Sequence, residues 1–221
     1  MIKKLFFAFL LLVLAGYGAV EVAAKRFAEA KIEQAVAERD PQARDVKADV
    51  SAPVVFDLAR ERTVRSVEVS AGHLDLEDLI ADRASATATG VHVDLGASAR
   101  QRKLVISSID RLDLDLKISQ EEASKLAPRG FAFEFGSGVV TVRGPVGSVQ
   151  GRLEVASPSE LGFRPQAPLP GLPAISLRFD LAPLVDCLQG VEVVPGAIRI
   201  TCSKDDPPTD SFLPGDREGS G

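Results

Sequence analysis

Residues 111–118 read Arg-Leu-Asp-Leu-Asp-Leu-Lys-Ile, a strict alternation of charged and aliphatic side chains. A β-strand directs successive side chains to opposite faces, so this segment has one aliphatic and one charged face. Such alternation is typical of antiparallel sheets with one face in water, whereas parallel strands covered on both faces are continuously apolar. We therefore predict an antiparallel sheet with a single buried face.

The same period of two recurs on both sides of this segment. The other expected strands carry their apolar positions at Val67, Val69 and Ala71; Val91, Val93, Leu95 and Ala97; Phe131, Phe133 and Phe135; Val149, Leu153 and Val155; Ile175, Leu177, Phe179 and Leu181; and Ile198 and Ile200. The sheet should therefore contain most of the chain.

Helical spacing is confined to a few places. One amphipathic helix is predicted over Val22–Arg39, ended by Asp40-Pro41. Short helical inserts are predicted at Leu76–Asp82 and Ser119–Leu126, the second opened by a capping-box pattern, Ser119-Gln-Glu-Glu122. We predict an α+β fold dominated by β structure, with a curved antiparallel sheet wrapped around one long N-terminal helix.

The first residues have the pattern of an export signal. Lys3 and Lys4 precede an uncharged apolar run, Leu5–Val20. Its sixteen residues lie between a signal core of ~7–15 and a spanning helix of ~17–25 residues. Residues 1–21 are therefore either a cleaved signal peptide or a retained N-terminal membrane anchor. In both cases the protein is expected to be exported and to be either membrane-anchored or associated with the cell envelope.

The rest of the chain divides into one domain and a tail. Residues 22–203 should form a single domain, and residues 204–221, rich in Pro, Asp, Gly and Ser, should form a disordered acidic tail. The only cysteines, Cys187 and Cys202, flank a turn at Pro195-Gly196. In an oxidising compartment they are expected to form a disulfide.

Composition and motifs argue against several function classes. Lys and Arg number 26 against 31 Asp and Glu, so no bulk positive field is available to bind nucleic acid. His73 and His92 fall on polar positions outside any cluster of metal-ligand spacing. The nucleophile motif Gly-x-Ser-x-Gly is absent from the sequence. We expect no enzyme activity, catalytic residue, metal or cofactor.

Two basic clusters have two possible interpretations. Arg60, Arg62 and Arg65 form one cluster, and the other contains Arg100, Arg102 and Lys103. Either cluster could be a solvated loop or could contact anionic lipid head groups at a membrane surface, because guanidinium groups suit phosphate oxygens.

The expected strands present more apolar side chains than one helix can cover. The sheet could close and fill its own interior, which composition alone favours, or curve into a trough that keeps space for an apolar ligand. In an exported protein that ligand would be an acyl chain, because each buried methylene contributes ~0.8 kcal/mol without any catalytic group.

Two segments near the C-terminus resemble a known family. Leu181-Ala-Pro-Leu184 and Val193-Val-Pro-Gly-Ala-Ile198 are similar to a Leu-Pro-Leu-like turn and a final hairpin in the LmeA family of actinobacterial cell-envelope phospholipid-binding proteins. Ala182 interrupts the turn, and Ala197 stands where the family has a second Gly. The resemblance implies a fold similar to tubular lipid-binding domains and non-catalytic phospholipid binding.

These arguments favour phospholipid, or another acyl-chain lipid, bound in an apolar trough at the bacterial cell envelope. The alternative is an anchored structural or adaptor protein with a packed core and no lipid. The expected lipid contacts, each of which could also be ordinary core, are Phe27, Leu112, Leu114, Leu116, Phe131, Phe133, Phe135, Leu177 and Phe179.

Overall fold

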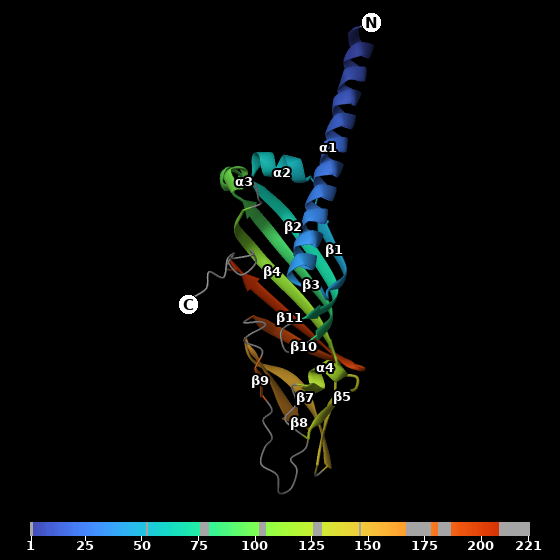
Figure 1. Cartoon of the computed structure of the whole chain (residues 1–221), viewed down its shortest axis with the longest axis vertical. Helices are drawn as coiled ribbons and strands as arrows, with labels where there is room; N and C mark the ends of the chain where they lie inside the picture. The colour runs from blue at the N-terminus through green and yellow to red at the C-terminus, as the bar shows by residue number, and fades with distance from the viewer. Residues whose placement is uncertain are drawn as a thin grey trace.

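The computed structural model describes residues 2–51, 53–75, 80–101, 105–125, 130–145, 147–166, 178–180 and 187–207. Over these ranges the chain folds into helices and two antiparallel sheets (Figure 1). In chain order the elements are α1 (Ile2–Arg39), β1 (Arg44–Val50), α2 (Val54–Arg60), β2 (Thr63–Asp75), β3 (Ile80–Val93), α3 (Leu95–Gln101), β4 (Ile106–Ser119), α4 (Gln120–Lys125), β5 (Ala132–Phe135), β6 (Val140–Gly144), β7 (Gly147–Ser157), β8 (Glu160–Pro165), β9 (Arg178–Asp180), β10 (Leu188–Val194) and β11 (Ala197–Asp205).

The larger sheet has six strands in the order β1-β2-β3-β4-β11-β10. The alternating segment that predicted the fold lies in β4, near the middle of this sheet. Leu116 of β4 pairs in register with Ala84 of β3 and with Ile200 of β11, so the aliphatic positions of neighbouring strands share one face. The charged positions Asp113 and Asp115 share the opposite face, as the alternation predicts.

The smaller sheet has five strands in the order β5-β6-β7-β8-β9 and packs its aromatic side against one end of the larger sheet. The buried cluster between them, here called the inter-sheet core, unites aliphatic side chains of β4, β10 and β11 with Phe side chains of β5 and β8. Its most deeply buried members are Ile118, Val140 and Ile200, each no more than 1% exposed. Backbone bonds such as Gly196 N to Phe135 O, 3.1 Å, join the two sheets at the rim of this core.

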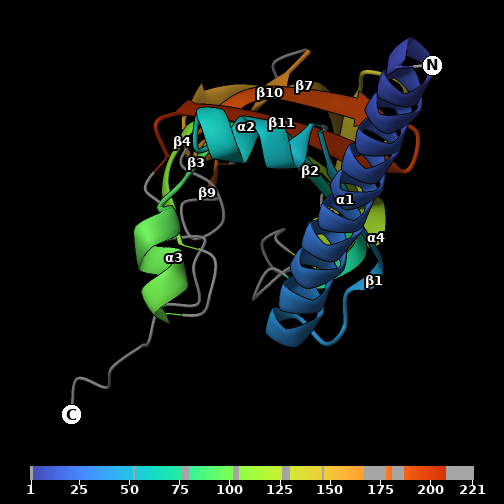
Figure 2. The ribbon, with the colours of Figure 1, turned by 90° about the horizontal axis from the view of Figure 1, so that it is seen from above.

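A second buried cluster, here called the helix-side core, lies at the other end of the six-stranded sheet. Its buried members are Val50, Val54, Val64, Val91 and Ile109. Partly buried side chains of α1 and α2 pack against it, which places both helices over this end of the aliphatic face. Viewed from above, the sheet is curved, with α1 and α3 toward opposite sides (Figure 2).

The predicted fold class is confirmed: the protein is a β-dominated α+β structure with antiparallel sheets and an N-terminal helix packed against the sheet. The helix end predicted at Arg39 is also correct, and α1 extends back to Ile2 without a break. β11 continues through Asp205, and residues 208–221 of the expected tail lie outside the described residues.

Three local predictions need correction. Leu95 and Ala97 were expected in a strand, but they lie in α3, because the Asp94 carboxylate accepts a bond from Ala97 N (2.8 Å) and starts a helix there. Ile80–Asp82, expected to be helical, begin β3, and residues 76–79 lie outside the described residues. The sequence prediction also missed α2 entirely.

The predicted insert at Ser119 is confirmed as α4, but its cap is only half of the expected box. Ser119 Oγ accepts a bond from Glu122 N (3.4 Å). The Glu122 carboxylate instead accepts a bond from Ile80 N at the start of β3 (3.2 Å) and binds Lys125 Nζ (2.6 Å). This side chain therefore connects α4 to β3 rather than completing the cap.

Helix α1 is held to the edge of the sheet by its carboxylates. Glu33 accepts a bond from Ala48 N (3.0 Å), and Glu29 accepts one from Val50 N (3.3 Å), both on edge strand β1. Glu21, 9% exposed, accepts bonds from the backbone amides of Val54 and Val55 at the start of α2. We call this row the carboxylate seam; it gives acceptors to amides of the edge strand β1 and of the first turn of α2.

The seam generates a first prediction. Replacing Glu21 by Ala leaves the Val54 and Val55 amides without their acceptor, so we expect unfolding free energy to fall by about 1–3 kcal/mol. Hydrogen exchange at these two amides should accelerate. The matched control is Glu38→Ala. It removes an exposed carboxylate that accepts a hydrogen bond from Gln34 of the same helix. Unchanged exchange at both amides in Glu21→Ala would contradict the seam.

Candidate functional site on the aliphatic sheet face

The two buried clusters leave a band between them on the aliphatic face. Val69 of β2 pairs with Ala86 of β3, which pairs in turn with Leu114 of β4. We call these three residues the central strip. All three are half-buried, and Val69 and Ala86 belong to neither cluster.

Strand β3 carries small side chains on the aliphatic face. Ala84, Ala86 and Ala88 occupy three consecutive inward positions of β3, each opposite a leucine of β4. On β2, Ala86 and Ala88 lie opposite valines, and Ala84 lies opposite Ala71. The band is therefore apolar, and its middle strand carries smaller side chains than β4.

The predicted lipid contacts fall into three groups. Leu112 and Leu116, each 7% exposed, and the half-buried Leu114 lie on the aliphatic face, beside or within the central strip. Phe133 and Phe135, stacked with ring centroids 6.1 Å apart, are buried in the inter-sheet core, and Phe131 packs against that core.

The remaining predicted contacts lie elsewhere. Phe27 is 67% exposed on α1, whereas Ala28 and Ile32 of the same helix pack against the helix-side core. Phe179 lies in β9, where its backbone pairs with Leu161. Leu177 lies outside the described residues.

The sequence prediction missed two residues of the strip as contacts. Val69 was assigned to a strand without a role, and Ala86 was not singled out. A usable signal was present in Ala84-Ser-Ala-Thr-Ala88, which alternates with period two but with a methyl group at each apolar position, where residues 112–116 carry Leu.

The opposite face of the sheet is held by ion pairs. Arg111 Nε binds both oxygens of Asp113 (3.1 Å), and Arg199 Nε binds Asp115 (2.9 and 2.7 Å) across β4 and β11. Hydrogen bonds from Arg111, and from Ser203 on the paired strand, lower the pKa of Asp113. This face carries the charged side chains, so the apolar surface of the sheet is confined to the other side.

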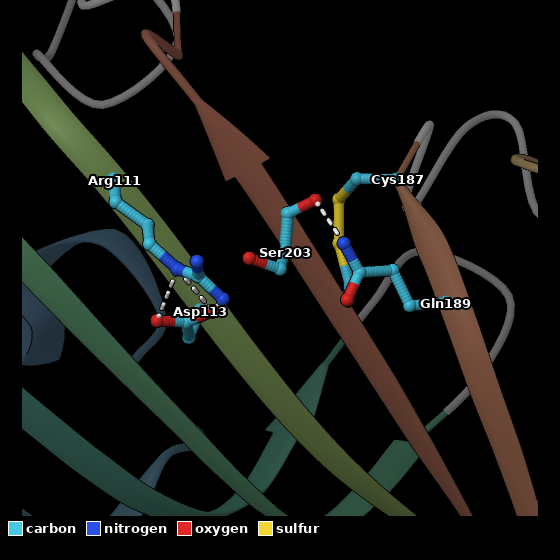
Figure 3. The surroundings of a disulfide bond; sticks show 6 residues. Arg111, Asp113, Cys187, Gln189 and Ser203 are labelled. Carbon is cyan, nitrogen blue, oxygen red and sulfur yellow. Dashed lines mark hydrogen bonds and ion pairs between the residues drawn. A yellow bond between two sulfur atoms is a disulfide. The ribbon is translucent and has the colours of Figure 1, made fainter.

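The predicted disulfide joins Cys187 to Cys202. Cys202, 4% exposed, pairs in register with Leu114, so the bond ties the segment before β10 to the strand that adjoins the central strip. Gln189 Nε2 donates to Ser203 O (3.2 Å) beside it, as Figure 3 shows. The disulfide therefore braces the outer hairpin of the six-stranded sheet.

His92, Thr63 and Asp110 form a hydrogen-bonded group. The two ring nitrogens of His92 lie 2.9 Å from Thr63 Oγ1 and 3.0 Å from Asp110 Oδ1, which links β2, β3 and β4 near α3. Among the described residues, no group of three or more His, Cys, Asp or Glu side chains could hold a metal ion. The same part of the chain contains no helix long and apolar enough to cross a membrane.

No family model matches this chain, and neither does any curated protein or solved structure.

The bridge made by Glu122 leads to a pH prediction. The bond from Lys125, with a further contribution from Ile80 N, lowers the pKa of Glu122 from its ordinary value of 4.5. A depressed folded-state pKa means that the stabilisation is complete above the unfolded value and is lost as the pH falls through the lower folded value. Stability contributed by Glu122 should therefore disappear on acidification below about 4.5.

Glu122→Gln tests this assignment. We expect it to lower the unfolding free energy at neutral pH by at most about 1 kcal/mol, as for an exposed ion pair, because the Lys125 side chain is 53% exposed. It should also flatten the loss of stability at acidic pH, measured by urea denaturation across a pH series. The control is Glu121→Gln, at the exposed neighbouring position. Equal acid profiles for the two variants would contradict the bridge.

Proposed function

We propose that the protein binds the acyl chains of a phospholipid along the central strip, without catalysis, at the bacterial cell envelope. The observation that supports this is the band of half-buried aliphatic surface between two fully buried clusters. Within this band, Val69 and Ala86 belong to neither cluster. The proposal rests on this face rather than on the family resemblance.

The energetics favour a hydrocarbon ligand. Each methylene removed from water contributes ~0.8 kcal/mol, so about ten methylenes provide ~8 kcal/mol. That is the free energy of a micromolar complex before the cost of immobilising the ligand. A polar ligand would find few partners on the strip, because Val69, Ala86 and Leu114 offer no side-chain hydrogen bonds.

An extracytoplasmic location is part of the proposal. The Cys187–Cys202 disulfide favours an oxidising compartment. The apolar run Leu5–Val20, preceded by Lys3 and Lys4, has the pattern of an export segment. Both features suit a protein that meets phospholipid at the outer side of a membrane.

A pair of neighbouring substitutions tests the strip. Ala86→Leu enlarges the side chain in the middle of the central strip, whereas Thr87→Leu places the same side chain on the polar face of the same strand. Displacing two or more methylenes of a bound chain at ~0.8 kcal/mol each should weaken lipid binding about tenfold or more. Native mass spectrometry and lipid extraction of the purified full chain measure the occupancy. Lipid that merely coats the apolar run will be equal in the two variants.

The expected result is co-purified phospholipid in the unsubstituted chain and in Thr87→Leu, with a marked loss in Ala86→Leu. Circular dichroism and urea denaturation check that Ala86→Leu is folded. An unsubstituted chain with no specific lipid, or equal lipid in both variants, would overturn the proposal. A lipid-free chain that repeatedly captures the same protein partner would support the alternative of an anchored adaptor.

A further inference from the structure

Helices α2 and α3 lie at the same end of the six-stranded sheet. α2 connects β1 to β2 and α3 connects β3 to β4, and alternate connections of an antiparallel meander share one end. A bond from Val93 N to Arg62 O (2.8 Å) joins the two connections directly. Figure 1 shows both helices at the end from which α1 projects, opposite the five-stranded sheet.

The apolar run of α1 ends at this same place. Leu5–Val20 lies within α1, and the next residue, Glu21, bonds to Val54 N and Val55 N at the start of α2. The residue that directly follows the run therefore contacts α2. If the run is embedded in a bilayer, α2 lies at the level of its surface.

α2 is fixed with one side outward. Val54, the partly buried Leu58 and the buried Asp57 face the protein, and Asp57 pairs with Arg65 of β2 at 2.9 Å. Phe56, 45% exposed, and Arg60 lie on the outer side, where the Arg60 guanidinium stacks over the Phe56 ring at 5.8 Å. An aromatic ring beside a guanidinium suits the boundary between acyl chains and head groups.

Exposed apolar side chains gather at this end. Among the described residues, the large hydrophobic side chains that are exposed all belong to the first three helices: Val20, Val22, Phe27, Phe56 and Leu95. None lies on the five-stranded sheet as far as the structure describes it. This distribution of exposed apolar side chains favours the end with α2 and α3 as a contact surface.

Three arginines are exposed at this end. Arg60, Arg62 and Arg100 lie on α2, on its connection to β2 and on α3, and the exposed acidic residues Glu61 and Asp94 lie beside them. The carboxylate of Asp57 on α2 is buried and paired with Arg65. Exposed guanidinium groups suit the phosphate oxygens of lipid head groups.

We infer that the end formed by α2 and α3 rests on an anionic lipid bilayer, with the apolar run of α1, whose sixteen residues fall short of a spanning helix of ~17–25 residues, entering that bilayer. This surface is separate from the central strip, and the inference stands whether or not the strip holds a lipid. It requires that the run be retained, because cleavage after Ala23 or Ala24 would remove Glu21 and its bonds to α2.

The absence of Trp from the sequence makes a direct test available. Single Trp residues are introduced into the full chain at Phe56 or Leu95, or at exposed Ser148 on β7 as the control. Each variant is reconstituted into vesicles of phosphatidylglycerol and phosphatidylcholine, with or without brominated acyl chains. Bromine quenches Trp that reaches the acyl region, and contact also shifts emission to the blue.

The expected result is strong quenching and a blue shift for Phe56→Trp and Leu95→Trp, and neither for Ser148→Trp. Adding Arg60→Gln and Arg100→Gln should reduce the quenching at position 56, whereas Arg152→Gln on β7 should not. Equal quenching at all three Trp positions, or quenching insensitive to the two arginines, would overturn the inference.

Intact mass of the exported protein provides a second measurement. A mass that includes Leu5–Val20 supports retention, and a mature chain that begins after Ala24 would also overturn the inference. Neither Trp quenching nor intact mass depends on the lipid occupancy of the Ala86→Leu variant. Failure of this inference can therefore be distinguished from failure of the strip as a lipid site.

Discussion

The structure depends on withdrawing one face of a six-stranded sheet from water. An aliphatic face of this breadth is unstable when exposed, because each Å² of apolar surface kept in water costs roughly 25 cal/mol. The fold covers one end of the face with a second sheet and the other end with two helices. The positions of the second sheet and of the two helices, rather than the composition of the six-stranded sheet, decide which part of the aliphatic face is left uncovered.

The sheet was predictable from sequence because its signal is local and repeated. Leu112, Leu114 and Leu116 alternate with charges, and the period of two needs no knowledge of the partner strands to assign their faces. The α+β class followed from this pattern and from one helical stretch. Long, strongly periodic segments express their structure because burial and backbone geometry favour the same conformation.

The positions of the helices were harder to predict. Glu29 and Glu33 have the pattern of a solvated helix face, yet their acceptors are used by amides of the edge strand β1. Sequence shows the charge but not the tertiary donor that meets it. α2 is seven residues long and held by Glu21 from a distant segment, so its stability is not local either. For the central strip, Ala86 gave a weak signal because a methyl group contributes little to the hydrophobic pattern on which periodicity depends.

α1 runs unbroken for 38 residues, which at 1.5 Å per residue is about 57 Å. No glycine-rich or proline-rich spacer separates its apolar half from the half bonded to β1, so the two halves behave as a single strut. A flexible linker between the apolar run and the sheet would let the sheet take many orientations relative to that run. If the run enters a bilayer, as proposed above, a continuous helix fixes both the distance of the sheet from the membrane and its direction, so the domain tilts only with its helix.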